Sequence, residues 1–343
     1  MALPRIHDIA RLAGVSTATV DRVLNKRAGV RDLTVQRVLR VARELDYLPP
    51  STDVAPLDGV ARAMRITFLL PDGRNRYVRM LGEMVGYSQD RWLPFNVRCK
   101  TELVEAFNPK ALADALLRHA RRADGVAIMA QEHPTVREAV HKVTSGGVPV
   151  ITLISDLSSS ERIAYLGLDN RAAGRTAGYL IGRFIGAKTA KVALIAGSRS
   201  YLAHEEREAG FLHVLSDAFD YLEVVGLREG HDDSEQNYQQ ARSLIDQYPN
   251  LAGIYNIGGA SDGVARALKE AGLEQRIVLI GHGLTPDTRA LLIDGSMDAV
   301  ITQSPHSTLA NAVRIFVNVR EGLAPLSGVE STRGQVIFRE NLP

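Results

Sequence analysis

The stretch "GVSTATVDRVLN", residues 14–25, decides how the amino-terminal region folds. Gly14 can adopt the left-handed conformation that ends a helix, and Ser16 can cap the next helix by accepting a backbone N–H. Before the glycine, apolar residues recur on one helix face: Ile6, Ile9, Ala10 and Ala13. After it, the buried stripe of a second helix is expected at Val20, Val23 and Leu24. The pattern therefore predicts two short helices joined by a glycine turn.

A third helix is expected over about residues 32–45, with its inward side chains at Val35, Val38, Leu39, Ala42 and Leu45. Three short helices with a glycine turn between the first two are typical of a helix-turn-helix, whose second helix enters the major groove of DNA. Thr17, Ala18 and Arg22 lie off the buried stripe and are the candidate base readers. Arginine can bond guanine, and alanine or a threonine methyl can pack on a thymine methyl. The same pattern also fits a plain three-helix packing module.

Charge separates this head from the rest of the chain. The whole chain carries +2, but residues 1–50 hold nine lysines and arginines against five acids, a net +4, which leaves −2 for the remainder. A small basic head on a mildly acidic body suggests a polyanionic partner for the head alone. Ordinary solvation of a charged surface is the alternative.

From Arg65 onward, short apolar runs alternate with helical stretches. The runs that read as strands are "RITFLLP", "FNVRCK", "GVAIMA", "VPVITLI", "KVALIAG", "AGIYNIG", "IVLIG" and "DAVITQ". This alternation predicts an α/β body with parallel sheets covered on both faces. The stretch is too long for one sheet, so two doubly wound lobes are expected. The predicted organisation is a small all-α head at residues 1–48, a linker or hinge at 49–63 and a two-lobed body at 64–343.

The sequence "IHDIARLAGVSTATVDRVLN" resembles the amino-terminal signature of the lactose/galactose-repressor (LacI/GalR-type) family of bacterial transcription regulators. The family pattern reads roughly D-[IV]-A-x-x-A-G-V-S-x-x-T-V-S-R-V-L-N. In the body, "LGLDNRAAGRTAGYLIG", "EREAGF" and "IGHGLTPDTRALLIDGSMDAVITQSP" are similar to further family segments. The resemblance implies sequence-specific DNA binding and a body like the type I periplasmic binding proteins. Its lobes would comprise about residues 64–166 with 303–326 and residues 167–302 with 327–343.

The head departs from the family pattern at three places. Asp21 stands where the family usually has a serine that meets a phosphate, so a carboxylate there would repel the DNA backbone. Arg31 replaces another serine and could still meet a phosphate as a cation. Pro56 would interrupt the family's hinge helix, in which Leu57 is the candidate for the side chain that wedges into the minor groove. The linker could instead be a flexible tether. Ser16, Asn25 and Arg31 complete the predicted DNA contacts.

The resemblance places a sugar-like effector between the lobes. The predicted effector-binding residues are Asn75, Tyr77, Asp156, Arg207, Asp262, His282 and Gln303. Arg207 and Gln303 match family ligand positions best, whereas His282 stands where the family often has an aspartate. Each residue also has a structural alternative, such as a helix cap for Asp262 or a turn cap for Asn75.

Several classes of function find no support in the sequence. Cys99 is the only cysteine, which excludes an internal disulfide, and the nine histidines have no metal-ligand spacing. A phosphate-cradling G-x-x-x-x-G-K-[ST] loop and a G-x-S-x-G nucleophile motif are both missing, so we expect no enzyme, no metal and no cofactor. Because no run of about 18 apolar residues occurs and the start has no apolar signal core, a cytoplasmic location is expected.

The sequence thus predicts a ligand-controlled transcription factor, most simply a repressor. Its body is expected to form a homodimer, with a tetramer as a further possibility, so that two heads address a pseudo-palindromic operator in double-stranded DNA. The alternative is a small-molecule-binding regulator whose specific DNA binding is weak or lost and which acts through protein contacts.

Overall fold

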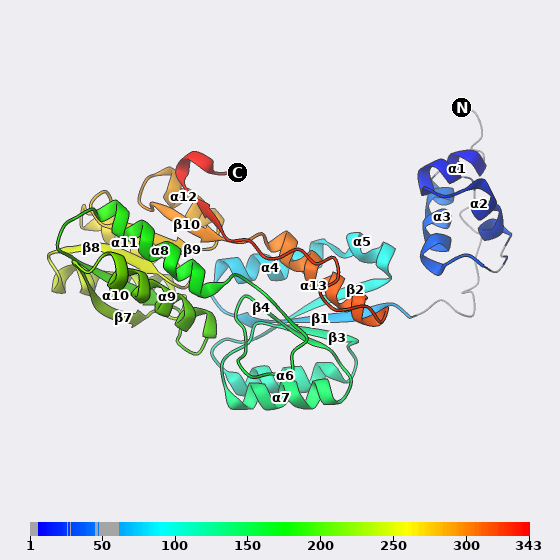
Figure 1. Ribbon diagram of the computed structural model, residues 1–343, viewed down its shortest axis with the longest axis horizontal. Helices are drawn as coiled ribbons and strands as arrows, with labels where there is room; N and C mark the ends of the chain where they lie inside the picture. The colour runs from blue at the N-terminus through cyan, green and yellow to red at the C-terminus, as the bar shows by residue number, and fades with distance from the viewer. Residues whose placement is uncertain (1–5, 26, 28, 45–46, 48–61) are drawn as a thin grey trace. The chain divides into compact units, whose positions relative to one another are not determined.

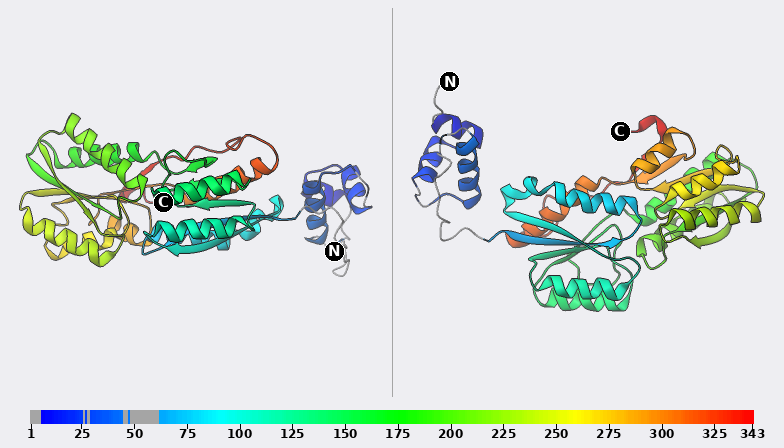
Figure 2. Two further views of the ribbon diagram at one scale, coloured as in Figure 1. Left: turned by 90° about the horizontal axis from the view of Figure 1, so that it is seen from below. Right: turned by 180° about the vertical axis from the view of Figure 1, so that it is seen from behind.

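The computed structural model describes residues 6–25, 27, 29–44, 47 and 62–343 (Figures 1 and 2). These residues form two compact units, which are treated separately below. One unit comprises the described residues up to Met64 together with Ser88–Arg98, which include helices α5 (Gln89–Trp92) and η1 (Leu93–Phe95). The other comprises Arg65–Tyr87 and Cys99–Pro343. Most of the predicted linker, including Pro56 and Leu57, lies outside the described residues.

The head folds as a helix-turn-helix, as the sequence predicts. It consists of α1 (Ile6–Ala13), α2 (Thr17–Leu24) and α3 (Asp32–Glu44). Gly14 has a φ of +63°, and the side chain of Ser16 caps α2 by accepting from the Thr19 N–H at 3.1 Å. The three helices share one apolar core, made of Ile9, Ala10, Ala13, Val20, Val23, Val38, Val41 and Ala42. Leu45, predicted to join this core, is outside the described residues.

The first lobe of the body is built on a five-stranded sheet in the order β2-β1-β3-β4-β5. Its strands are β1 (Met64–Asp72), β2 (Val97–Glu105), β3 (Gly125–Ile128), β4 (Val150–Leu153) and β5 (Ala164–Leu166). Its helices are α4 (Arg76–Tyr87), α6 (Pro109–Ala120), α7 (Pro134–Ser145) and α13 (Pro305–Arg320). Figure 1 shows α6 and α7 on one face of the sheet and α4 and α13 on the other. Both faces are therefore buried, as parallel sheets require.

The second lobe is built on a six-stranded sheet in the order β11-β10-β9-β8-β6-β7. Its strands are β6 (Ala190–Ala196), β7 (Leu222–Glu229), β8 (Leu251–Asn256), β9 (Val278–His282), β10 (Ala299–Thr302) and β11 (Gln335–Ile337). Its helices are α8 (Asn170–Ile185), α9 (Leu202–Ala218), α10 (Ser234–Gln247), α11 (Ser261–Glu270), α12 (Pro286–Ile293) and η2 (Arg339–Asn341). Strands β6 to β10 pair in parallel, whereas β11 pairs antiparallel with β10. Two apolar clusters, one containing Phe211 and the other containing Leu268, fill the second lobe.

The chain passes between the two sheets three times. Strand β5 ends at Leu166 in the first sheet, and α8 begins at Asn170 in the second lobe. Strand β10 ends at Thr302, and α13 returns to the first sheet, where the Phe316 ring lies where a side chain at Gly125 of β3 would project. The chain then rejoins the second sheet at β11. Within the part of the chain that the structure describes, no helix is long and apolar enough to cross a membrane.

Candidate functional site

Helix α2 exposes the side chains predicted to read DNA bases. Thr17 and Ala18 occupy its first turn and Arg22 its last, and all three are exposed, while Val20 and Val23 on the opposite side are buried. The Ser16 hydroxyl is engaged locally with the Thr19 hydroxyl at 2.9 Å as well as with the backbone. The helix therefore presents a polar surface on a small rigid core, which is the arrangement that a recognition helix needs.

The Asp21 carboxylate is held by neighbours on the same surface. It accepts a hydrogen bond from Asn25 Nδ2 at 2.8 Å and lies 3.5 Å from Arg27 Nη1. The Arg27 cation therefore offsets part of the negative charge that Asp21 brings to α2. Asn25, predicted as a DNA contact, has one amide hydrogen engaged by this bond. Arg31 is exposed immediately before α3, where its carbonyl accepts from Thr34 and Val35.

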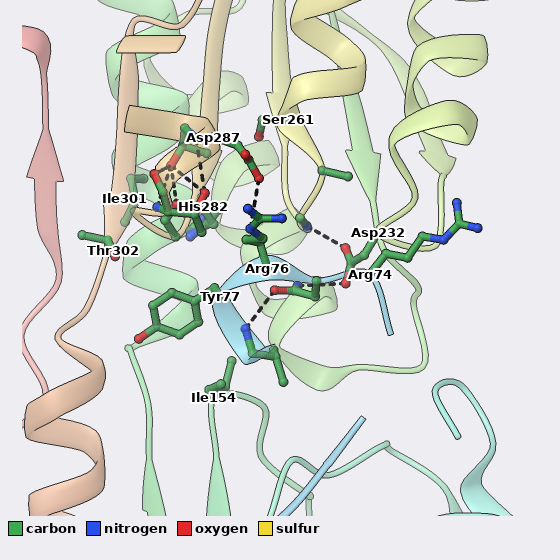
Figure 3. Close-up of a pocket in the computed structure, with 18 of the residues that line it drawn as sticks. Arg74, Arg76, Tyr77, Ile154, Asp232, Ser261, His282, Asp287, Ile301 and Thr302 are labelled. Atoms are coloured by element: carbon green, nitrogen blue, oxygen red, sulfur yellow. Dashed lines mark hydrogen bonds and ion pairs between the residues drawn. The ribbon is translucent and has the colours of Figure 1, made fainter. Parts of the chain in front are cut away.

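A cavity of about 200 Å³ lies between the two lobes of the body (Figure 3). It is lined mainly by loops and helix starts that follow the carboxyl ends of strands, which is where open α/β sheets bind ligands. Six of the seven predicted effector residues line it: Asn75, Tyr77, Arg207, Asp262, His282 and Gln303. Its volume is below the range of drug-sized pockets and suits a ligand of monosaccharide size.

Asp156 is the predicted residue that does not line the cavity. Burial disfavours its charged form, but hydrogen bonds from Arg162, from the Thr152 hydroxyl at 2.6 Å and from the Leu157 N–H at 2.8 Å outweigh this and lower its pKa. The carboxylate is thus engaged in holding its own loop together. Ile154 lines the cavity from this loop instead.

Three of the seven non-glycine residues with positive φ in the described part of the chain line the cavity. Ile154, Asp232 and Ala260 line it with φ values of 64°, 53° and 55°, a region that L-residues rarely occupy and that is least favourable for a β-branched side chain. Such conformations persist where the surrounding structure imposes them, and they cluster at binding sites. The strain therefore supports the cavity as the functional region of the body.

Arg207 is positioned by the close packing of α8 against α9. The two helices meet where glycines leave room, since a Cβ on Gly174 would lie 2.0 Å from the Arg207 carbonyl oxygen. The guanidinium is buried, with Nε donating to Asn170 Oδ1 at 2.8 Å and Nη1 donating to the Ile257 carbonyl at 2.9 Å. Among the described residues, no carboxylate lies within ion-pair distance of it. Burial is the main cause that lowers the pKa of Arg207.

Two histidines near Arg207 are held in the neutral form. Burial lowers the pKa of His204 to about 4, and burial, then the charge of Arg207, lowers that of His282 well below its usual range. The His282 Nε2 lies 2.7 Å from the Tyr255 hydroxyl, whereas its Nδ1 is shielded from solvent and has no partner among the described residues.

Gln303 and Asp262 differ in how much of their hydrogen-bonding capacity is free. Gln303 is buried, and both amide atoms of its side chain lack a partner among the described residues, while its backbone carbonyl accepts from the Tyr77 hydroxyl at 3.1 Å. Asp262 accepts from the Ser234 hydroxyl at 2.6 Å and lies one residue inside α11, whose cap position is Ala260. Asp262 is therefore not a helix cap, which was the structural alternative considered for it from the sequence.

The segment Arg74–Arg76 bridges the lobes, a role that the sequence did not reveal. Arg74 pairs with Asp233. Asn75 Nδ2 donates to Asp232 at 2.9 Å, and Arg76 lies 3.6 Å from Asp287 (Figure 3). These pairs join positions more than 150 residues apart, so no local pattern could find them. The only local hint of these contacts is the pair of aspartates in "HDDSE", which follows a strand.

The lining can form many directed hydrogen bonds around a small polar molecule. It mixes these groups with apolar side chains, including Met129, Leu168 and Ile301. Within the described residues, no three His, Cys, Asp or Glu side chains are grouped so that they could hold a metal ion. The arrangement suits the binding of a small polar molecule.

Two known families account for the two parts of the chain. Residues 5–50 match the family of bacterial regulatory proteins called the lacI family, and residues 110–324 match a periplasmic binding protein domain. Together the two matches follow the division into head and body.

Similar proteins include regulators and sugar-binding proteins. The ribose operon repressor of Halalkalibacterium halodurans is 26% identical over 84% of this chain and 80% of its own. The transcriptional repressor PurR of Erwinia tasmaniensis is 28% identical over 81% of this chain and 80% of its own. The glucose-galactose binding protein GanP of Geobacillus stearothermophilus has the same fold, with a TM-score of 0.74 at 24% identity over 82% of this chain and all of its own. This chain therefore belongs to the periplasmic binding protein domain family, whose model covers most of its body, and its head is a helix-turn-helix domain of the lacI type.

Proposed function

We propose that this protein is a DNA-binding transcriptional repressor whose grip on its operator is set by a small sugar-like molecule in the interlobe cavity. One observation carries this proposal: a helix-turn-helix with an exposed recognition surface shares a chain with an interlobe cavity that is lined by polar side chains. The ribose operon repressor and the transcriptional repressor PurR among its relatives support the same combination. The protein acts by binding and release rather than by catalysis.

On the DNA side, Thr17, Ala18 and Arg22 read base edges in the major groove. Ser16, Asn25 and Arg31 contact the backbone near them, with Arg31 acting as a cation toward a phosphate. A homodimer presents two such heads to a pseudo-palindromic operator, with half-sites about one helical turn apart, and a tetramer would bridge two operators.

On the ligand side, Asn75, Tyr77, Arg207, Asp262, His282 and Gln303 surround the bound molecule. The ligand changes DNA affinity only if it binds two arrangements of the lobes unequally. Because residues 74–76 join the lobes through Asp232, Asp233 and Asp287, these contacts are the ones that a change in lobe arrangement must remake.

Asp21 favours a second candidate function, a regulator that binds its ligand but holds DNA weakly and works through protein contacts. Its carboxylate lies on the helix that would face the phosphates, although Arg27 and Asn25 engage it. The substitution Asp21→Ser distinguishes the two functions. If the protein is a repressor that already binds its operator, the substitution should raise its DNA affinity modestly. If the protein has lost DNA binding, only the variant should bind DNA specifically.

The test is a salt titration of DNA affinity on a duplex selected from a random library by the purified full chain. A head that makes six or more phosphate contacts loses about a thousandfold in affinity between roughly 50 and 200 mM salt, and the selected duplexes share an inverted repeat. Selection that yields no common sequence, with weak binding at every salt concentration, would contradict the repressor function.

A further inference from the structure

We propose that Tyr165 and Asn170 are positioning residues of the interlobe site, which orient the guanidinium of Arg207 from the segment where the chain first crosses between the lobes. Neither residue lines the cavity, but Arg207 and Ile154, which both line it, are hydrogen-bonded to them. This inference rests on the proposed function only in taking the cavity as the ligand site.

The first observation is that Asn170 is buried beside the guanidinium and does not cap its own helix. It is the first residue of α8 and only 1% exposed. The cap of this helix is the preceding residue, Asp169, whose side chain accepts from the Ala172 N–H at 2.8 Å. The amide oxygen of Asn170 instead accepts from Nε of Arg207 at 2.8 Å. This contact limits the directions in which the guanidinium can point.

The second observation is that the Tyr165 hydroxyl orients this amide from β5 of the first lobe. The amide nitrogen of Asn170 donates to the hydroxyl at 2.9 Å, which leaves the amide oxygen facing Arg207. Glu206, half-buried on α9, is a further neighbour of the same amide. If the amide turned over, its N–H donors would face the Nε–H donor of Arg207. The two contacts together therefore select one orientation of the amide.

The third observation is that the same hydroxyl joins the crossing segment to the wall of the cavity. Its single proton faces two carbonyl oxygens, that of Ile154 at 2.9 Å and that of Leu168 at 3.0 Å. Both residues line the cavity, Ile154 from the first lobe and Leu168 from the crossing segment (Figure 3 labels Ile154). Burial raises the pKa of Tyr165, so the proton stays on the hydroxyl. A turn of the crossing segment alters these distances, and the change passes through Asn170 to Arg207.

The fourth observation is the close passage of the crossing segment against this hydroxyl. A Cβ added to Gly167 would lie 2.0 Å from the Tyr165 hydroxyl oxygen. Any side chain at position 167 must therefore displace the hydroxyl. This glycine offers a way to disturb the hydrogen bonds without changing any of the residues that make them.

The test is the rate at which the Arg207 Nε–H exchanges with solvent, measured by NMR on the full chain with isotope-labelled arginine, without ligand or DNA. The signal is assigned by its absence from the spectrum of Arg207→Gln. We expect Tyr165→Phe to speed this exchange at least tenfold, because the Asn170 amide loses the partner that orients it. Tyr238→Phe is the matched control: it removes a hydroxyl of the second lobe that donates to Glu270 at 2.6 Å, and the exchange at Arg207 should not change.

Three further variants distinguish positioning from general stabilisation of the fold. Gly167→Ala and Asn170→Leu should speed the exchange at Arg207 as Tyr165→Phe does. Asn170→Asp keeps an oxygen toward the Arg207 Nε–H, so its exchange should stay within threefold of the parent. A residue that only stabilises the fold would speed the exchange of the backbone N–H groups of β6 by the same factor. Unchanged exchange at Arg207 in Tyr165→Phe and Gly167→Ala, or equal acceleration at β6, would overturn the inference.

The outcome is separable from that of the proposed function, because the exchange is measured without ligand and without DNA. If the chain selects an operator but the exchange at Arg207 is the same in every variant, the repressor function stands and the positioning role is wrong. If the exchange changes as expected but the chain selects no DNA sequence, the positioning role stands and the repressor function is wrong.

Discussion

Arg22 is the residue on α2 that carries the most sequence information, because a guanidinium can bond both acceptors of a guanine at once. We expect Arg22→Ala to weaken binding to the selected operator by about 1–3 kcal/mol and to relax the preference at one base position. Arg31→Ala is the matched control: removal of a phosphate contact should weaken all sequences equally. Repeated selection with each variant measures this, and an unchanged base preference in Arg22→Ala would remove it from the set of base readers.

Arg207 is expected to govern the ligand response alone. In Arg207→Ala, the change in DNA affinity that a bound ligand causes should be lost, while DNA affinity without ligand stays within about twofold, because the substitution lies in the body. Arg183→Ala, an exposed arginine on α8, serves as the control for a lost charge. Anisotropy titrations with and without ligand measure both quantities, and a normal ligand response in Arg207→Ala would place this residue outside the recognition site.

The two neutral histidines make stability depend on pH. The pKa of His204 is about 4 in the folded chain and about 6.5 in the unfolded chain. Between these pH values the unfolded chain binds a proton at this residue and the folded chain does not. Its contribution is present in full above pH 6.5 and is lost as pH falls toward 4, at up to about 1.4 kcal/mol per pH unit. Chemical denaturation of His204→Asn between these pH values should show a shallower loss of stability than the parent, whereas parallel profiles would refute the buried neutral state.

For single residues, the resemblance predicted a place at the cavity most reliably where the neighbouring sequence closely matches the family segment. Arg207 and Gln303 lie on segments whose neighbours match the family closely, and both line the cavity. Asp156 shows the limit: a carboxylate beside the cavity was expected, but Arg162, six residues later, folds back and engages it. That contact depends on the path of an irregular loop, which no periodic pattern encodes.

Among the elements, the pair α8 and α9 sets the geometry of the cavity. Gly174→Ala places a methyl group 2.0 Å from a backbone oxygen of α9, so the helices must separate, and we expect a loss of about 1–3 kcal/mol in the free energy of unfolding. Gly86→Ala on α4 is the control, since nothing lies within 4 Å of its added carbon, and it should be neutral or stabilising by up to about 1 kcal/mol. Thermal unfolding compares the two, and equal midpoints would argue against the close crossing.

Strands with continuous or alternating apolar residues were predictable from the sequence, whereas the mixed edge strand β7 and the short strand β11 were not. The runs in β1, β3, β4, β6, β8 and β9 are buried nearly throughout, so their sequences are continuously apolar. Strand β7, at the edge of its sheet, is largely half-buried and mixes charged with apolar residues, and β11 has only three residues. Neither β7 nor β11 has a run of apolar residues that would identify it as a strand from the sequence. The antiparallel pairing of β11 therefore became known only from the structure.

In the proposed function, the whole molecule couples the binding of a small ligand to the binding of DNA. The head has its own core, and the cavity lies wholly within the body, so each can be altered without unfolding the other. Coupling must therefore run through a change in the arrangement of the lobes, and its size equals the difference in ligand affinity between the two arrangements. The sequence alone could predict two lobes with a ligand between them, but not the contacts of residues 74–76 that join the lobes.

The most direct test of the central claim is capture of sheared genomic DNA, from the organism that encodes this protein, by the purified full chain, followed by sequencing of the bound fragments. The same capture is done with Arg22→Ala and with the sugar that binds the full chain most tightly. We expect a few sharply enriched sites that share an inverted repeat. In Arg22→Ala the enrichment should weaken and the preference at one base position should relax, and the ligand should change the occupancy of the sites. Diffuse capture that depends only on salt, and is the same for the variant and in the presence of ligand, would contradict it.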